Sequence, residues 1–441
     1  MLVMLVLWFG LLAALVILLT VYRSGGMLTL AYFLGLSLIH VPGVLVFLDG
    51  GSGLQYAEET AVGFELTLLG MFTFLTGAIV AVRMHKRQNT HPRGPLQSAG
   101  QGFGRIGWRL VAAGFVAYFV FAPLSFSIPS LTGAIVAMGT LLVIGLWIEL
   151  YAASATNNRR RTALALAAVP VLPFATVVSG GFISYGTYWA LSVIAFLFVI
   201  TRQRVWFYVM TPIVVVLGLS VFVTYMGERV GIRQVVQQQA AFSERLTRVS
   251  TIVTQFQILD LNSPLHRQQL NDRLNQNFLV GAGVMRHQSG LTDFAYGSTV
   301  PWWAPIPRAV WSDKPVVGGG GDVVAQYTGI VFGPETSVGV GQVLEFYINF
   351  GVPGVIVGFF GLGFLLMRLD RAITRAFAES DLRVLLLTAM PALNLLQPGG
   401  NLLEIVVGTL TAFLTAHALL YFGVFGVRAK AKSAGAVSQA Q

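Results

Sequence analysis

The chain contains no cysteine and few charged residues. Without cysteine it can form no disulfide and no thiolate site for a metal or cluster. Charged residues make up 10% of the sequence, against about 25% in an ordinary soluble domain. Hydrophobic residues make up 55%, and the mean hydropathy is +0.73. The core of a soluble domain cannot absorb that much apolar surface, so most of it must face lipid or line a membrane bundle.

The apolar residues are gathered into about eleven segments, most of them close to the ~20 residues that a bilayer requires. The segments are 2–22, 27–48, 61–82, 108–124, 128–150, 162–179, 185–201, 205–225, 343–367, 384–398 and 401–424. The first has no basic region before it and is longer than a signal-peptide core, which predicts a retained span. Segment 384–398 is short, and 108–150 is open to a second interpretation as one re-entrant pair around Pro123 and Pro129. We expect an all-α polytopic membrane protein with about eleven transmembrane helices.

Arginine and lysine fall on alternate connections between these segments. Basic residues collect on cytoplasmic loops, so these connections are predicted to lie in the cytoplasm. The residues are Arg23, Arg83, Lys86, Arg87, Arg93, Arg105, Arg109, Arg159, Arg160, Arg161, Arg202, Arg204, Arg368, Arg371, Arg375, Arg383, Arg428, Lys430 and Lys432. The N-terminus is then expected outside and the C-terminus inside. Because the basic residues are dispersed over separate short loops, nucleic-acid binding is not expected.

One long connection, 226–342, is expected on the outer face, with nine Lys/Arg against eight Asp/Glu. Long loops are translocated regardless of charge, so its basic residues do not contradict this placement. The predicted organisation is an N-terminal bundle of about eight helices (1–225), the large outer loop (226–342), about three C-terminal helices (343–424) and a cytoplasmic tail (425–441).

Within this loop, residues 243–260 and 271–278 show helical periodicity. Leu270, Leu274 and Phe278 form one stripe, while Arg273 and Asn277 lie four residues apart on another face. The remainder, 281–341, is rich in Gly, Pro and Trp and predicts a structured, mostly irregular cap.

Two motifs in and after this cap combine rigid backbone with ionisable groups. Residues 306–315 read I-P-R-x-x-W-x-x-K-P, and residues 345–354 read E-x-Y-x-N-F-G-x-x-G. Prolines preset the backbone around Arg308 and Lys314. Glu345 falls near the outer membrane boundary, where an ionisable group is costly and therefore a functional candidate.

These two motifs, and the layout with a large outer loop before the last spans, resemble the bacterial O-antigen and capsule repeat-unit polymerases of the Wzy type. The resemblance implies a membrane glycosyltransferase of the C type (GT-C-like) that polymerises undecaprenyl-diphosphate-linked oligosaccharides at the outer face of the bacterial cytoplasmic membrane. It also implies a lipid-linked donor and acceptor and makes a chain-length regulator and a flippase plausible partners. O-antigen ligases share the general architecture and remain an alternative.

The chemistry of such a transfer selects the candidate site residues. Arginine stabilises the leaving diphosphate because its planar guanidinium pairs with phosphate oxygens and stays charged. The acceptor hydroxyl needs a base, usually a carboxylate or histidine. The predicted catalytic residues are Glu345, Arg308 and His287, and the predicted diphosphate- or substrate-binding residues are Arg273, Arg308, Lys314, Arg233, Trp311 and Asn349. No Asp-x-Asp pair is present, so a metal-bound nucleotide-sugar site is unsupported, and neither metal nor cofactor is expected.

Each candidate also has a structural interpretation. The cations could pair with nearby carboxylates or lipid headgroups, Glu345 could form a buried ion pair, and His287 could be a surface residue. Trp311 could be an interfacial anchor. The sequence alone does not decide between these roles.

The spans give little support for a transporter or flippase, which would need paired ionisable groups along the helices and related halves. Only His40 lies deep in a hydrophobic stretch, and Glu149, at a cytoplasmic boundary, is expected to snorkel. Gly354, Gly358, Gly361 and Gly363 predict close helix packing of the ninth span. An enzyme of the outer face is therefore favoured, with a ligase or a flippase as the alternatives.

Overall fold

The computed structural model describes residues 1–22, 25–50, 56–86, 103, 106–121, 129–201, 205–238, 240–306, 310–314, 319–333 and 338–425. Within these ranges the regular structure is entirely helical, which confirms the all-α prediction. The elements are α1 (Leu2–Tyr22), α2 (Met27–Gly50), α3 (Ala57–Lys86), α4 (Ile106–Val116), the π-helix η3 (Ala117–Phe121), α6 (Pro129–Met138), α7 (Thr140–Ala155), α8 (Arg159–Ala168), α9 (Val171–Gly180), α10 (Ser184–Ile200), α11 (Val205–Gln237), α12 (Phe242–Thr254), α13 (Pro264–Arg273), α14 (Asn277–Gln288), α15 (Gly320–Thr328), α16 (Gln342–Glu379), α17 (Leu382–Leu395) and α18 (Leu402–Tyr421).

Eight helical stretches in the described part of the chain are long and apolar enough to cross a bilayer. They are Leu2–Val21, Met27–Asp49, Ala57–Met84, Gly133–Ala155, Arg159–Gly180, Met210–Gln237, Gln342–Glu379 and Leu402–Tyr421. The other predicted spans coincide with the shorter apolar helices Ile106–Phe121, Ser184–Ile200 and Leu382–Leu395. The chain is therefore an α-helical protein with the helices that a membrane requires.

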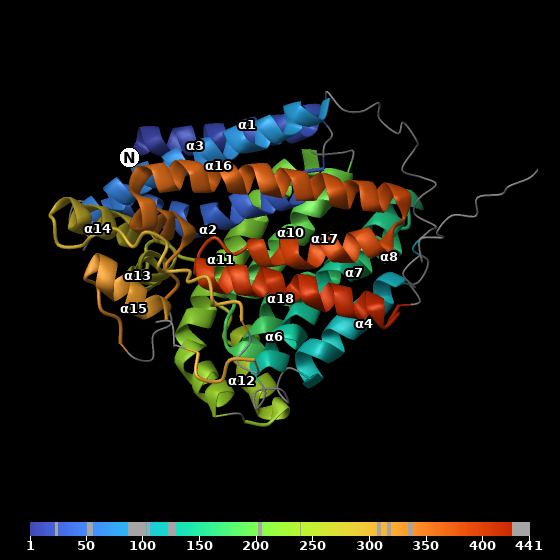
Figure 1. Ribbon diagram of the computed structural model, residues 1–441. Helices are drawn as coiled ribbons and strands as arrows, with labels where there is room; N and C mark the ends of the chain where they lie inside the picture. The colour runs from blue at the N-terminus through green and yellow to red at the C-terminus, as the bar shows by residue number, and fades with distance from the viewer. Residues whose placement is uncertain are drawn as a thin grey trace, which may run out of the picture.

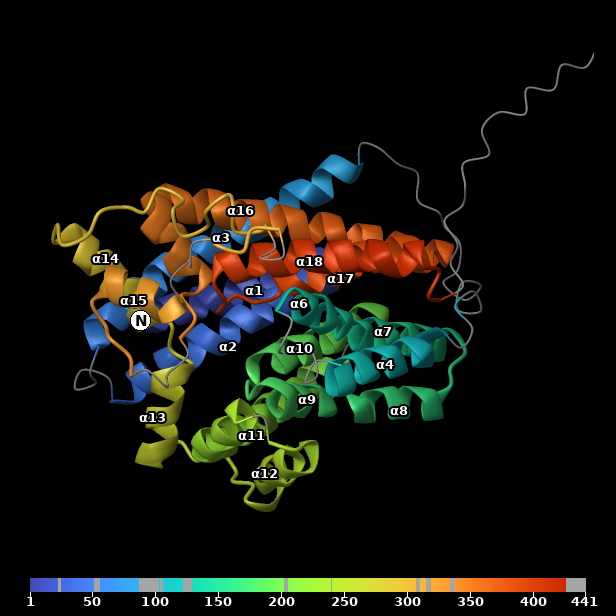
Figure 2. The same cartoon turned by 60° about the horizontal axis from the view of Figure 1, so that its bottom comes forward.

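The long helices form one bundle, and three helices of the long connection gather at one end of it. In both views α13, α14 and α15 lie at this end, and α8 lies at the other (Figure 1 and Figure 2). At the far end, Asp370 of α16 accepts hydrogen bonds from the backbone N–H of Leu28 (2.8 Å) and of Thr29 (3.0 Å), capping the start of α2. Arg371 donates to the carbonyl of Ala81 there as well (2.6 Å). Connections predicted to share one face of the membrane thus lie together.

The packing of α3 along α16 is made close by two glycines. A Cβ added to Gly77 would meet the carbonyl oxygen of Phe360, and one added to Gly363 would meet that of Phe74. Gly354 and Gly358 instead accommodate Phe346 of their own helix, and Gly361 faces open space. The predicted helix-packing role therefore holds for Gly363, because small residues let helix backbones approach in a membrane.

We expect Gly363→Leu to prevent the docking of α3 on α16 and to remove most of the folded protein from the membrane. The reason is that the new side chain would meet backbone atoms, which cannot rotate away. The measurement is fluorescence-detected size exclusion of a tagged protein. Gly361→Leu is the control, because a Cβ at that position meets no atom within 4 Å. Equal accumulation of the two variants would contradict this packing.

The structure differs from the predicted elements at three places. Helix α11 continues to Gln237, so the boundary predicted at 225 lies inside it and its last turns carry Arg229 and Arg233. The predicted helix 243–260 is shorter and ends at Thr254. The predicted continuous helix through 271–278 is wrong, because α13 ends at Arg273 and α14 begins at Asn277.

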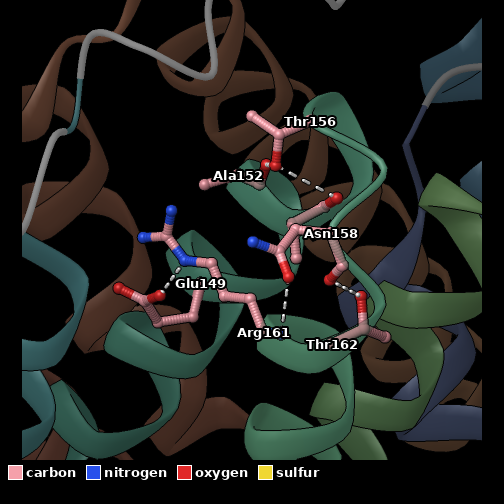
Figure 3. A network of polar contacts seen from close by, with 7 residues as sticks. Glu149, Ala152, Thr156, Asn158, Arg161 and Thr162 are labelled. Atoms are coloured by element: carbon pink, nitrogen blue, oxygen red, sulfur yellow. Dashed lines mark hydrogen bonds and ion pairs between the residues drawn. The ribbon is translucent and has the colours of Figure 1, made fainter.

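Glu149 does not snorkel, contrary to expectation. Its side chain is fully buried and forms an ion pair with Arg161. Figure 3 shows this pair beside the start of α8, where Asn158 accepts a hydrogen bond from the backbone N–H of Arg161 (3.1 Å) and so caps the helix. The start of α8 brings Arg161, which is partly exposed, to the buried carboxylate of Glu149, so the carboxylate is paired inside the protein and does not extend to the surface.

Candidate functional site

A cavity of about 420 Å³ is lined in part by residues of α13 and α14, two helices that lie at one end of the bundle (Figure 2). This is within the range of about 300–1,000 Å³ that is typical of ligand sites. It is lined by Ile39, Phe182, Ile183, Ser184, Tyr185, Tyr188, Phe222, Tyr225, Met226, Arg229, Arg233, Asp272, Arg273, Leu274, Asn275, Gln276, Phe278, Leu279, Phe332, Val338, Gly339, Gln397, Gly399, Gly400, Asn401 and Glu404. The lining combines an aromatic surface with three arginines, two carboxylates and several amides.

One wall is positioned by backbone hydrogen bonds to α2 beside a proline. Pro42 lies inside this helix and has no N–H to donate. The carbonyl of Ile39 accepts from the backbone N–H of Gln276 (2.9 Å), and the N–H of Gly43 donates to the carbonyl of Leu274 (3.3 Å). The non-helical segment 274–276 therefore exchanges two backbone hydrogen bonds with α2 on either side of Pro42. This docking fixes the end of α13 and with it Arg273.

A network of buried polar side chains also holds segment 274–276 in place. His40 Nδ1 and Asn277 Oδ1 are 2.6 Å apart, and Asn277 Nδ2 donates to the carbonyl of His40 (2.8 Å). Asn275 Nδ2 donates to Thr60 Oγ1 (3.0 Å) and to Asn271 Oδ1 (2.9 Å). The network ties α2, α3, α13 and α14 together, so His40 has a structural role in the positioning of the cavity wall.

Three arginines converge on the cavity. Arg229 and Arg233 lie one turn apart on α11, and Arg273 is the last residue of α13. Burial of Arg273 and its repulsion by Arg229 and Arg233 lower the pKa of Arg273 to about 10. The nearby carboxylate of Asp272 acts in the opposite direction and offsets part of this shift. The guanidinium carbon of Arg233 lies 4.6 Å from the centre of the Phe182 ring. Cations packed this closely form a site for an anion.

Another wall is the connection 397–401 together with Glu404 at the start of α18. Asn401 Oδ1 accepts from the backbone N–H of Val340 (2.9 Å). Glu345 is buried and its Oε2 accepts from the backbone N–H of Leu402 (2.6 Å), so it caps α18 from another helix. Glu345 thus lies behind this wall and fixes it, whereas Glu404 lines the cavity itself.

Asn349 lies where α16 breaks. Phe350 (φ −143°) and Gly351 (φ 63°, ψ −154°) are non-helical, and the second conformation favours glycine. Asn349 Nδ2 donates to Thr299 Oγ1 (2.8 Å) and its Oδ1 accepts from the N–H of Gly297 (2.8 Å). Both ends of the amide are thereby used within the protein, and the residue is not part of the cavity lining.

Three other predicted residues, Lys314, Trp311 and His287, are not part of the cavity lining. Lys314 Nζ donates to the carbonyls of Ala304 and Ile306 (both 2.9 Å). Trp311 packs edge-on against Trp303, with ring centres 6.2 Å apart. His287 Nδ1 is 2.9 Å from the carbonyl oxygen of Thr292. Arg308 lies outside the described residues.

Of the predicted site residues, the structure therefore brings Arg233 and Arg273 together in one cavity. Arg229 and Glu404 belong to the same cavity but were not assigned to the site from sequence. The signal that could have found Arg229 is its four-residue spacing from Arg233, which places both on one helix face.

Comparison of the chain with family models, with curated proteins and with solved structures finds no significant match.

Proposed function

We propose that the protein is a membrane glycosyltransferase that polymerises undecaprenyl-diphosphate-linked oligosaccharide repeat units into a surface polysaccharide. The observation that carries this proposal is the convergence of Arg229, Arg233 and Arg273 on one cavity at an end of the membrane bundle. Three guanidinium groups suit a diphosphate, whose charge grows when it leaves the sugar. A lipid-linked substrate would present that group at the membrane surface, and the proposal places the cavity there.

In the proposed reaction an acceptor hydroxyl oxygen forms a bond to the anomeric carbon of the donor sugar. The bond from that carbon to the diphosphate oxygen breaks, and the electron pair leaves with the diphosphate, which the arginines stabilise. The hydroxyl proton passes to a carboxylate. We assign this role to Glu404, because it lines the same cavity as the arginines. Aromatic rings and amides of the lining, including Tyr185, Tyr188 and Gln397, would then contact the sugars.

The proposal includes a membrane arrangement. All eleven apolar segments would span the bacterial cytoplasmic membrane, with the cavity at the outer face and the C-terminus in the cytoplasm. The alternating basic connections support it. A chain-length regulator and a flippase would be partners of the same process, and an O-antigen ligase would use the same cavity chemistry on a different acceptor.

The test is deletion of the gene, followed by separation of the surface glycans on a gel. A polymerase predicts that the deletion strain attaches single repeat units only and that the wild-type gene restores the ladder of longer chains. Loss of all attached repeats would transfer the assignment to a ligase or a flippase. An unchanged ladder would remove the glycan function altogether.

A further inference from the structure

One face of α11 runs from the arginines of the cavity into the apolar part of the helix. Phe222, Met226, Arg229 and Arg233 all line the cavity, at spacings that place them on one side of a helix. Continuing the same spacing toward the N-terminal half of α11 reaches Gly218 and Val215, four and seven residues before Phe222. From Arg229 back to Val215 this face extends about 21 Å along the helix axis.

The face is exposed in its N-terminal part, and Phe222, nearer the cavity, is half-buried. Residues 210–218 are all exposed, with Val215 49% exposed, and a Cβ added to Gly218 would meet no atom within 4 Å. The opposite side of α11 is covered nearer the cavity. There Ser220 Oγ accepts from the N–H of Leu259 (2.9 Å) and Thr224 Oγ1 accepts from that of Gln257 (3.0 Å). The open apolar face and the arginine site are therefore consecutive on the same side of one helix.

We propose that this face of α11, formed by Val215, Gly218 and Phe222, seats the isoprenoid chain of the lipid-linked substrate while the arginines hold its diphosphate. A polyprenyl diphosphate has the same order of properties: an anionic group followed directly by a long apolar chain. The charge complementarity at one end and the unbroken apolar face at the other select this occupant over a protein partner. The inference rests on the proposed function and adds the path of the lipid.

The experiment places the photoreactive residue benzoylphenylalanine at position 215 or at position 213, in protein reconstituted into nanodiscs. Ile213 is the matched control, because it is 50% exposed in the same half of α11 but points to the opposite side. The probes are undecaprenyl diphosphate and phosphatidylglycerol, each radiolabelled in its apolar chain. Both variants are first checked by size exclusion for wild-type folding.

With undecaprenyl diphosphate we expect about fivefold more label at 215 than at 213, the ratio that a small binding preference produces. Adding Arg273→Ala to the variant at 215 should return its labelling to the level at 213, because the chain is held in place through its diphosphate. Phosphatidylglycerol should label the two positions equally.

Equal labelling of 215 and 213 by undecaprenyl diphosphate would overturn the inference and leave the glycan ladder test of the proposed function unaffected. A preference for 215 that phosphatidylglycerol shares would identify an ordinary annular lipid and would also overturn it. If position 215 is still labelled more than position 213 after Arg273→Ala, the lipid chain binds the apolar face independently of the arginines, which would contradict the proposed path. Selective labelling together with an unchanged ladder in the deletion strain would keep the lipid site and remove the polymerase.

Discussion

Arg273→Ala is expected to lower the formation of long glycan chains by about 100- to 1,000-fold, the usual cost of removing one preorganised charge-stabilising group. Arg273 is held at the end of α13 by the docking of 274–276 into α2, and Arg229 and Arg233 lie close enough to lower its pKa. The measurement is the glycan ladder in the deletion strain that carries the variant at matched membrane level. Single repeat units should persist.

Arg267→Ala is the matched control for this variant. Arg267 belongs to the same helix but forms an ion pair with Asp49 at 3.0 Å, in which both side chains are well exposed. Exposed pairs contribute little to stability, so this variant should keep the wild-type ladder. A normal ladder with Arg273→Ala would contradict the assignment of the arginines to the leaving diphosphate, and an equal defect with Arg267→Ala would indicate a general effect on α13.

Glu404→Gln should lower polymer formation by about 100- to 10,000-fold, because the amide keeps the shape of the side chain but cannot accept the hydroxyl proton. The defect should lie in the chemical step, so membrane vesicles supplied with lipid-linked repeat units should still bind them. Binding measured by co-purification of the radiolabelled lipid and turnover measured from the ladder separate the two effects.

Glu345→Gln tests whether the base is Glu404 or the buried carboxylate of Glu345. Its amide oxygen can still accept the hydrogen bond from the backbone N–H of Leu402, so the cap on α18 should be kept in weakened form. We expect most of the activity to remain and the thermal midpoint to fall. The reverse pattern, with Glu345→Gln inactive and Glu404→Gln active, would return the base to Glu345.

The helical membrane fold could be predicted from the sequence because apolar length and the placement of basic residues depend on local composition. The end of α11 could not be found this way. Hydropathy falls after Tyr225 while the helix continues to Gln237, and a hydropathy pattern does not distinguish a polar helical turn from a loop. For this reason the sequence alone places Arg229 and Arg233 in the outer loop. It does not show that both side chains lie on one face of a helix.

The chemistry of diphosphate binding predicted Arg233 and Arg273 as site residues. They line the same cavity although they lie in different helices. The two motifs were less informative about position. Glu345 caps a helix that begins 57 residues later, a contact that no local pattern reveals. Lys314 donates to backbone carbonyls of Ala304 and Ile306 within its own motif, so the prolines and the cation there organise the cap. The break between α13 and α14 contains neither proline nor glycine, and its residues instead exchange backbone hydrogen bonds with the distant helix α2 beside Pro42.

The contacts of α2 beside Pro42 are completed only by residues that the ribosome synthesises much later. The partners that complete this part of α2 come late, since Asn277 follows His40 by 237 residues. At ribosomal rates of about 5–20 residues per second, this delay is on the order of tens of seconds. During that interval the carbonyl of Ile39 lacks its native partner, in a medium where an unpaired backbone group is costly. The second span should therefore remain hydrated or held by the insertion machinery until 274–276 arrives, and chains truncated before this segment should be recognised and degraded.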